Sequence, residues 1–199
     1  MTILRASSAL FAATLTIGVL AGCVPGAEPE PSPTASFSPD ESAGPRVDPT
    51  ATPTATIEPD PGATPFSVPC ETLASLQTMY DFNPNFALTG SFSPTAGTPA
   101  ADAAADQGTL CRWVNATSGE AIDFTASIPS PAEFEARKAA AASGTPVTGL
   151  GADAWFTTEH DVGTVQVFKG DKWVTVSSAW FTLAQDAQAL VTEAANAVG

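Results

Sequence analysis

Few residues of this 199-residue chain could do chemistry, and they do not form a recognised catalytic arrangement. His160 is the only histidine and lies between Glu159 and Asp161. A serine hydrolase needs an imidazole oriented toward a distant nucleophile, and neighbours in a turn do not provide that orientation. A metal site needs several ligands at a suitable spacing, which the sequence does not show. We therefore expect a solvated His160, and we expect no catalytic residue, no metal site and no cofactor.

Asp102 and Asp106 come closest to a cation site. They lie in the stretch 93–108, which is rich in Ala, Gly and Pro, and we expect this stretch to be a loop. Hard cations need about six oxygen ligands in a defined geometry. Two aspartates in a loop fall short of that number, so we expect both to be solvated.

Three cysteines are the remaining reactive groups: Cys23, Cys70 and Cys111. Cys23 follows Arg5, an apolar run over 6–20 and the small residues Ala21 and Gly22. A run of this length is typical of a signal peptide and short for a membrane-spanning helix, which needs about 20 residues.

The order Leu20-Ala21-Gly22-Cys23 resembles the lipobox of bacterial lipoproteins. The resemblance implies that residues 1–22 are a signal peptide, that a diacylglyceryl group is attached to the thiol of Cys23, and that cleavage occurs between Gly22 and Cys23. A further acyl chain such as palmitate can then join the new amino terminus, and two or more chains hold a protein stably on a membrane. We expect a lipid anchor in the cell membrane, on its extracytoplasmic face. An uncleaved anchor and an ordinary secretory signal remain as alternatives.

If lipid occupies Cys23, the cysteines at 70 and 111 remain as an even pair. An even pair in an exported domain predicts a disulfide between Cys70 and Cys111.

Residues 23–68 are rich in Pro, Ser, Thr and acidic residues, and their apolar residues show no period. Such a segment cannot bury enough surface to offset its chain entropy, so we expect a disordered tether. The repeat at Thr52–Thr56 could take O-linked sugar or could be a bare spacer.

The charge balance excludes several classes of partner. The chain has 7 Lys and Arg against 21 Asp and Glu, a net charge of -14. Nucleic acid and anionic lipid surfaces are bound through clustered Lys and Arg. We expect no nucleic-acid partner, and solubility is the simplest reason for the acidic surface.

Residues 69–199 have the hydrophobic periodicity of one globular domain. The expected helices begin at Cys70, at Ser130 and at Thr182, the last two with capping-box sequences. In the first helix, Leu73, Leu76, Met79 and Tyr80 share one face. The expected strands cover 85–92, 109–117, 120–128, 153–159, 163–169 and 172–178. The order α-βββ-α-βββ-α predicts an α+β domain with an antiparallel sheet packed with helices.

Trp155 and Trp173 alternate with Phe156 and Val174 along their strands. If Phe156 and Val174 face the helices, the two tryptophans lie on the other side of the sheet. They could form an exposed face for a ligand, a glycan or a partner; a second core layer and coverage by loops are the alternatives.

The layout also resembles a known group of proteins. Besides the lipobox and tether, it has Pro69-Cys70, Cys111-Arg112-Trp113 and the run Gly149–Trp155. This is similar to actinobacterial lipoproteins with a small domain of unknown function and, more distantly, to the disulfide-bearing extracellular sensor domains of that group. The resemblance implies no reaction and no catalytic residues.

We therefore expect an envelope lipoprotein that displays a non-catalytic binding or sensor-like domain. The expected partner is an envelope protein or a glycan, and the sequence does not define the oligomeric state. The alternative is an envelope hydrolase that uses surface carboxylates, although nothing selects one pair among the 21 acidic residues.

Overall fold

The structure is a computed structural model that describes residues 57–90 and 92–199. The predicted signal peptide, the cleavage site at Gly22, the lipidation site at Cys23 and most of the predicted tether lie outside these residues. Within the described part of the chain, no helix is long and apolar enough to span a membrane.

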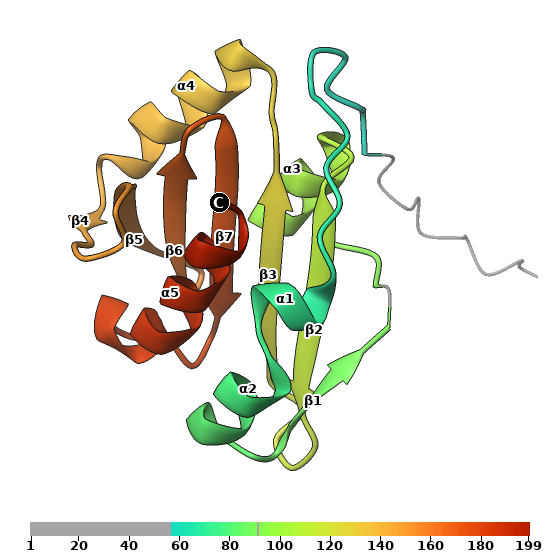
Figure 1. The fold of residues 1–199 in the computed structure, drawn as a ribbon, viewed down its shortest axis with the longest axis vertical. Helices are drawn as coiled ribbons and strands as arrows, with labels where there is room; N and C mark the ends of the chain where they lie inside the picture. The colour runs from blue at the N-terminus through green and yellow to red at the C-terminus, as the bar shows by residue number, and fades with distance from the viewer. Residues whose placement is uncertain (1–56, 91) are drawn as a thin grey trace, which may run out of the picture. The chain divides into compact units, whose positions relative to one another are not determined.

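The centre of the domain is an antiparallel sheet with the strand order β1-β2-β3-β7-β6-β5-β4 (Figure 1). Its strands are β1 (Phe86–Thr89), β2 (Thr109–Asn115), β3 (Ala121–Ser127), β4 (Thr145–Pro146), β5 (Asp153–Glu159), β6 (Val162–Lys169) and β7 (Lys172–Ser178). The predicted α+β class and antiparallel sheet are confirmed. β2, β3, β6 and β7 lie within a few residues of the expected strands and pair as the hairpins β2–β3 and β6–β7, with Gly170 and Asp171 in the turn of the second.

Helices cover both faces of this sheet. They are α1 (Cys70–Leu73), α2 (Leu76–Phe82), α3 (Pro99–Ala105), α4 (Pro131–Ala141) and α5 (Gln188–Ala197), with the 3₁₀ turn η1 (Ala184–Ala187) before α5. In Figure 1, α1, α2 and α5 lie on the near side of the sheet, and α3 lies behind it. We call these the near face and the far face.

The main core lies between the near face and α1, α2 and α5. Its buried side chains include Leu73, Met79, Trp113, Phe124, Val165, Val176 and Leu190. The C-terminal segment contributes further buried side chains to this core, namely Ala187, Leu190, Val191, Ala194 and Val198. Burial of this apolar surface is the main source of stability.

The first predicted helix is broken in two. Ala74 is extended (φ -147°, ψ 107°), and Ser75 then caps α2 by accepting a hydrogen bond from the backbone N–H of Thr78 at 3.2 Å. The break turns the second helix, so that Leu76 and Tyr80 are each 64% exposed. The expectation that both lie on the buried face was therefore wrong.

The predicted loop over 93–108 contains the helix α3. Thr98 caps it by accepting from the N–H of Ala101 at 3.3 Å, and Pro99 fits its first turn. Ala100, Ala101 and Ala103 are buried, and the helix packs against β2 and β3. The small alanine side chains allow α3 to pack closely on the sheet. Because alanine is only weakly hydrophobic, the sequence of this stretch showed no helical periodicity.

Residues 57–69, which we call the strap, belong to the folded domain. Asp60 donates its N–H to the carbonyl of Ala105 at 3.0 Å, and Thr64 pairs with Ile128. Its Asp60 carboxylate accepts the backbone N–H of Ser130 at 2.8 Å, just before α4. The predicted tether boundary at residue 68 is therefore wrong for the strap, because backbone pairing rather than hydrophobic periodicity holds it.

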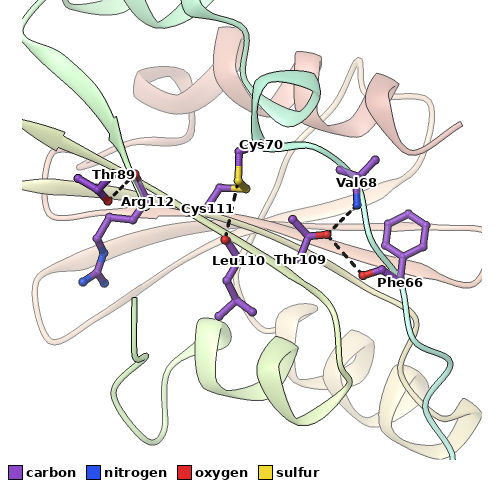
Figure 2. Close-up of a disulfide and its surroundings, with 8 residues drawn as sticks. All are labelled: Phe66, Val68, Cys70, Thr89, Thr109, Leu110, Cys111 and Arg112. Carbon is purple, nitrogen blue, oxygen red and sulfur yellow. Dashed lines mark hydrogen bonds between the residues drawn. A yellow bond between two sulfur atoms is a disulfide. The ribbon is translucent and has the colours of Figure 1, made fainter. Parts of the chain in front are cut away.

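The predicted disulfide joins Cys70 at the start of α1 to Cys111 on β2, with Cα atoms 5.5 Å apart (Figure 2). Beside it, the hydroxyl of Thr109 accepts the N–H of Val68 at 2.9 Å and donates to the carbonyl of Phe66 at 3.4 Å. The disulfide and these bonds together fasten the end of the strap to β2.

Candidate functional site

The two tryptophans proposed as a ligand face lie on the far face, as their alternation predicts. Trp173 is only 2% exposed, however, and Trp155 is half-buried. They form a second small core with Phe168 and with Phe134 and Ala141 of α4. The exposed platform was therefore wrong for Trp173, because α4 packs over this part of the sheet.

A buried ion pair between Asp106 and Arg137 lies beside the second core. The expectation that Asp106 is solvated was therefore wrong. The Asp106 carboxylate is fully buried, binds the guanidinium of Arg137, and accepts the hydroxyl of Ser127 at 2.7 Å. The same guanidinium lies 4.5 Å from the centre of the Trp173 ring. Asp106 is thus a structural anchor for α4.

Asp102, one helical turn earlier, is exposed as expected. Desolvation raises the pKa of its carboxyl above the ordinary value. Because Asp106 is occupied by Arg137, the two aspartates do not form a cation site.

The rest of the far face is polar, and it forms a hollow of about 230 Å³. One row across the sheet pairs Thr125, Thr175 and Gln166. The next row contains Asp123, Ser177, Thr164 and Thr157. All of these residues except the fully buried Thr175 line the hollow, and their hydroxyl, amide and carboxylate groups form its floor.

The walls of the hollow come from two turns. Gly97 to Ala100 form one side, at the start of α3. The turn between β5 and β6 forms the other side, with Glu159, His160 and Val162. Glu159 and His160 are exposed, so they lie at the rim of the hollow.

His160 lies in a turn, as predicted, but the turn is unusual. His160 (φ 48°) and Asp161 (φ 63°) both have positive φ angles between the paired residues Glu159 and Val162. This is the backbone of a type I′ hairpin, which normally favours Asn-Gly. Residues other than Gly adopt such angles at some cost in backbone strain. In this protein the turn places the imidazole of His160 at the rim of the hollow.

Asp123 is held at one end of the floor by Arg112 of the neighbouring strand. The guanidinium Nε and Nη2 each lie 2.7 Å from one carboxylate oxygen. This hydrogen bonding raises the pKa of Arg112, and the ring of Phe92 lies 3.8 Å from its guanidinium carbon. The charge of Asp123 is therefore largely compensated.

The other cationic side chains of the described residues also have partners within the fold. Lys138 binds Asp153 at 2.7 Å, and Lys172 contacts Asp171 at 3.2 Å. Lys169 donates to the carbonyl of Ala195 at 2.9 Å. Each Lys and Arg side chain within residues 57–90 and 92–199 therefore has a hydrogen-bond or ion-pair partner in the fold.

Within residues 57–90 and 92–199, no three His, Cys, Asp or Glu side chains lie together so that they could hold a metal ion. Comparison with protein-family models, with curated proteins and with solved structures gave no match to the chain.

Sequence reasoning missed most residues of the hollow. Asp123, Thr125, Thr164, Gln166 and Ser177 occupy alternating positions on strands, and none of them was predicted as a site residue. The available signal was that polar residues recur at matching positions on three neighbouring strands. That signal places them together but does not show that a hollow forms above them.

Proposed function

We propose that this chain is a binding module of the cell envelope, and that the far-face hollow holds a small polar molecule. The observation that carries the proposal is the concave floor itself, where side chains from β3, β6 and β7 present hydroxyl, amide and carboxylate groups. A few convergent polar groups in a concavity are typical of a ligand site.

The size of the hollow limits the ligand. Its volume of about 230 Å³ lies below the range of roughly 300–1,000 Å³ that drug-sized ligands occupy. We therefore propose an occupant with the size of one sugar ring or one amino acid. A glycan partner, one of the two expected from the sequence, would enter through a single terminal residue.

Binding explains the site better than carboxylate-pair hydrolysis. The two carboxylates that line the hollow are Asp123 and Glu159. A hydrolase would use one as an acid and the other as a base or nucleophile. Both oxygens of Asp123 are instead held by Arg112 at 2.7 Å, which suits a positioning role.

The proposed location of the module at the cell membrane is supported by the sequence alone. The lipobox Leu20-Ala21-Gly22-Cys23 supports a lipid anchor on the extracytoplasmic face of the cell membrane. In cells, we expect the Cys23→Ala variant to leave the membrane fraction or to remain as unprocessed precursor. A Cys23→Ala protein that is processed normally and stays on the membrane would contradict the anchor.

The binding function is tested by filling the hollow. The full-length chain would be screened by thermal shift and calorimetry against a panel of small sugars, amino acids, amines and carboxylic acids. We expect at least one compound to bind the wild type and to lose binding to Ser177→Phe, because Ser177 is half-buried in the floor.

The matched control is Ser67→Phe, which places the same side chain at an exposed position of the strap. It should bind like the wild type. If Ser177→Phe unfolds the protein, Gln166→Leu is the second floor variant. A ligand that binds all folded variants equally would show that the hollow is not its site.

A further inference from the structure

The floor of the hollow offers more hydrogen-bond donors than its own side chains use. Gln166 Oε1 accepts the indole N–H of Trp173 at 3.2 Å, which directs the amide nitrogen and its two hydrogens away from that ring. The Ser177 hydroxyl accepts from Thr164 at 3.0 Å and keeps its own hydrogen. Both residues line the hollow, so these hydrogens are available to a ligand.

Two buried threonines lie beneath these donors. Thr125 and Thr175 share one hydrogen bond of 2.7 Å, in which either hydroxyl can be the donor. Thr125 borders the hollow but is only 1% exposed, and Thr175 is fully buried. The hydrogens that face the hollow are therefore those of Gln166 and Ser177, and they favour an occupant that presents acceptor oxygens.

The rim differs from the floor in its charge. Glu159 is exposed at the rim, and no ion pair joins it to a cation of the described residues. Asp123 on the floor is compensated by Arg112. The one uncompensated carboxylate of the hollow is therefore at its mouth, where it can meet a positive group of a ligand.

We infer that the ligand is a small polyhydroxylated amine, of the chemical class of an amino sugar. This inference rests on the binding function proposed above. The ligand's hydroxyl oxygens accept hydrogen bonds from Gln166 and Ser177, and its ammonium group lies against Glu159. An anionic sugar is disfavoured, because it would bring a second negative charge to Glu159.

Three sugars of similar size separate these contributions: glucosamine, glucose and glucuronate. Their affinities for the full-length chain are measured by calorimetry or by ligand-observed NMR at low and high salt. We expect glucosamine to bind about twofold to fivefold more tightly than glucose at low salt, as for an exposed ion pair. Glucuronate should bind more weakly than glucose, and high salt should reduce all the differences.

Two isosteric variants test the assigned contacts. Glu159→Gln should remove the preference for glucosamine and leave glucose unchanged. Gln166→Glu still accepts from Trp173 but lacks the amide hydrogens, so it should weaken glucose about threefold to tenfold. The matched control is Glu120→Gln, the same change at an exposed turn away from the hollow, which should have no effect.

The outcomes separate this inference from the binding function. If glucosamine and glucose bind equally, or if Glu159→Gln changes nothing, the ammonium contact is wrong, although the hollow remains a binding site. If Gln166→Glu binds glucose like the wild type, the floor contact is wrong. If none of the three sugars binds at millimolar concentration, the ligand class is wrong, and the Ser177→Phe screen alone decides whether the hollow binds anything.

Discussion

Replacing Asp106 by Asn tests the buried ion pair that fixes α4 to the sheet. The Asp106 carboxylate is fully buried, binds Arg137 Nη2 at 3.1 Å, and accepts from Ser127 Oγ at 2.7 Å. Asn keeps the shape and can keep the bond to Ser127, but it cannot neutralise the guanidinium. The side chain of Arg137 is only 13% exposed, so water compensates the lost charge poorly.

Breaking a buried ion pair by removing one partner costs about 3–5 kcal/mol. We expect the lower end, about 3 kcal/mol, because Arg137 keeps some exposure and its contact with the Trp173 ring. With a urea m value of about 1–3 kcal/mol/M, the unfolding midpoint should fall by about 1–3 M.

Equilibrium urea unfolding of the full-length chain, followed by tryptophan fluorescence and by circular dichroism, measures this loss. The control is Asp102→Asn, an exposed aspartate of α3 one turn before Asp106, which is the C-cap of that helix. Because desolvation raises the pKa of Asp102, its ionised form is disfavoured by folding. We therefore expect Asp102→Asn to be neutral or slightly stabilising at pH 7, within about 0.5 kcal/mol.

A second substitution checks the cause. Adding Arg137→Leu to Asp106→Asn removes the uncompensated charge, so the double variant should be more stable than Asp106→Asn alone. A loss below about 1 kcal/mol for Asp106→Asn, or a double variant no more stable than the single one, would refute the argument.

Three further changes have expected outcomes. Replacing both Cys70 and Cys111 by Ala should lower the free energy of unfolding by about 4 kcal/mol in urea, because the bond closes a loop with a sequence separation of 41; a loss under about 1 kcal/mol would count against this account. The backbone N–H of Ser130, just before α4, donates to the Asp60 carboxylate and lowers the pKa of Asp60 below its ordinary 3.8. The ionised carboxylate therefore stabilises the fold above pH 3.8, and this stabilisation is lost as the pH falls through the lowered pKa. Asp60→Asn should accordingly show a shallower loss of stability in acid titration, and identical curves for variant and wild type would contradict the prediction. Gly163→Ala should lower the free energy of unfolding by about 1–3 kcal/mol, since its Cβ would lie 2.1 Å from a backbone oxygen. Gly90→Ala, with nothing within 4 Å, should keep the wild-type melting temperature, and equal losses for the two would exclude the steric explanation.

The sequence determined the elements whose signals are local. The two-residue period of β3, β5, β6 and β7 placed these strands within a residue of their observed ends. Ser130 and Pro131 marked the start of α4, where the Ser130 hydroxyl accepts the N–H of Glu133. The cysteine count paired the two residues that form the disulfide. These signals depend on the conformation of a few neighbouring residues, and the sequence displays them directly.

Only the tertiary structure decided what covers each face of the sheet. Alternation correctly placed Trp173 on the far face, but it could not show that α4 buries this residue. The spacing of Asp102 and Asp106 likewise could not show that only Asp106 meets Arg137. The strap showed no periodic signal in the sequence, and it is held by backbone hydrogen bonds to distant residues and by Phe66 and Val68, which pack against the core.

The hollow also depends partly on the sequence and partly on the tertiary structure. Polar residues at alternating strand positions determined that part of the far face is hydrophilic. Whether that face is open to bulk water, buried, or walled into a site depends on how α3 and the β5–β6 turn pack against it. Such packing joins residues far apart in the chain, and its geometry is set by the whole fold rather than by any local run of sequence.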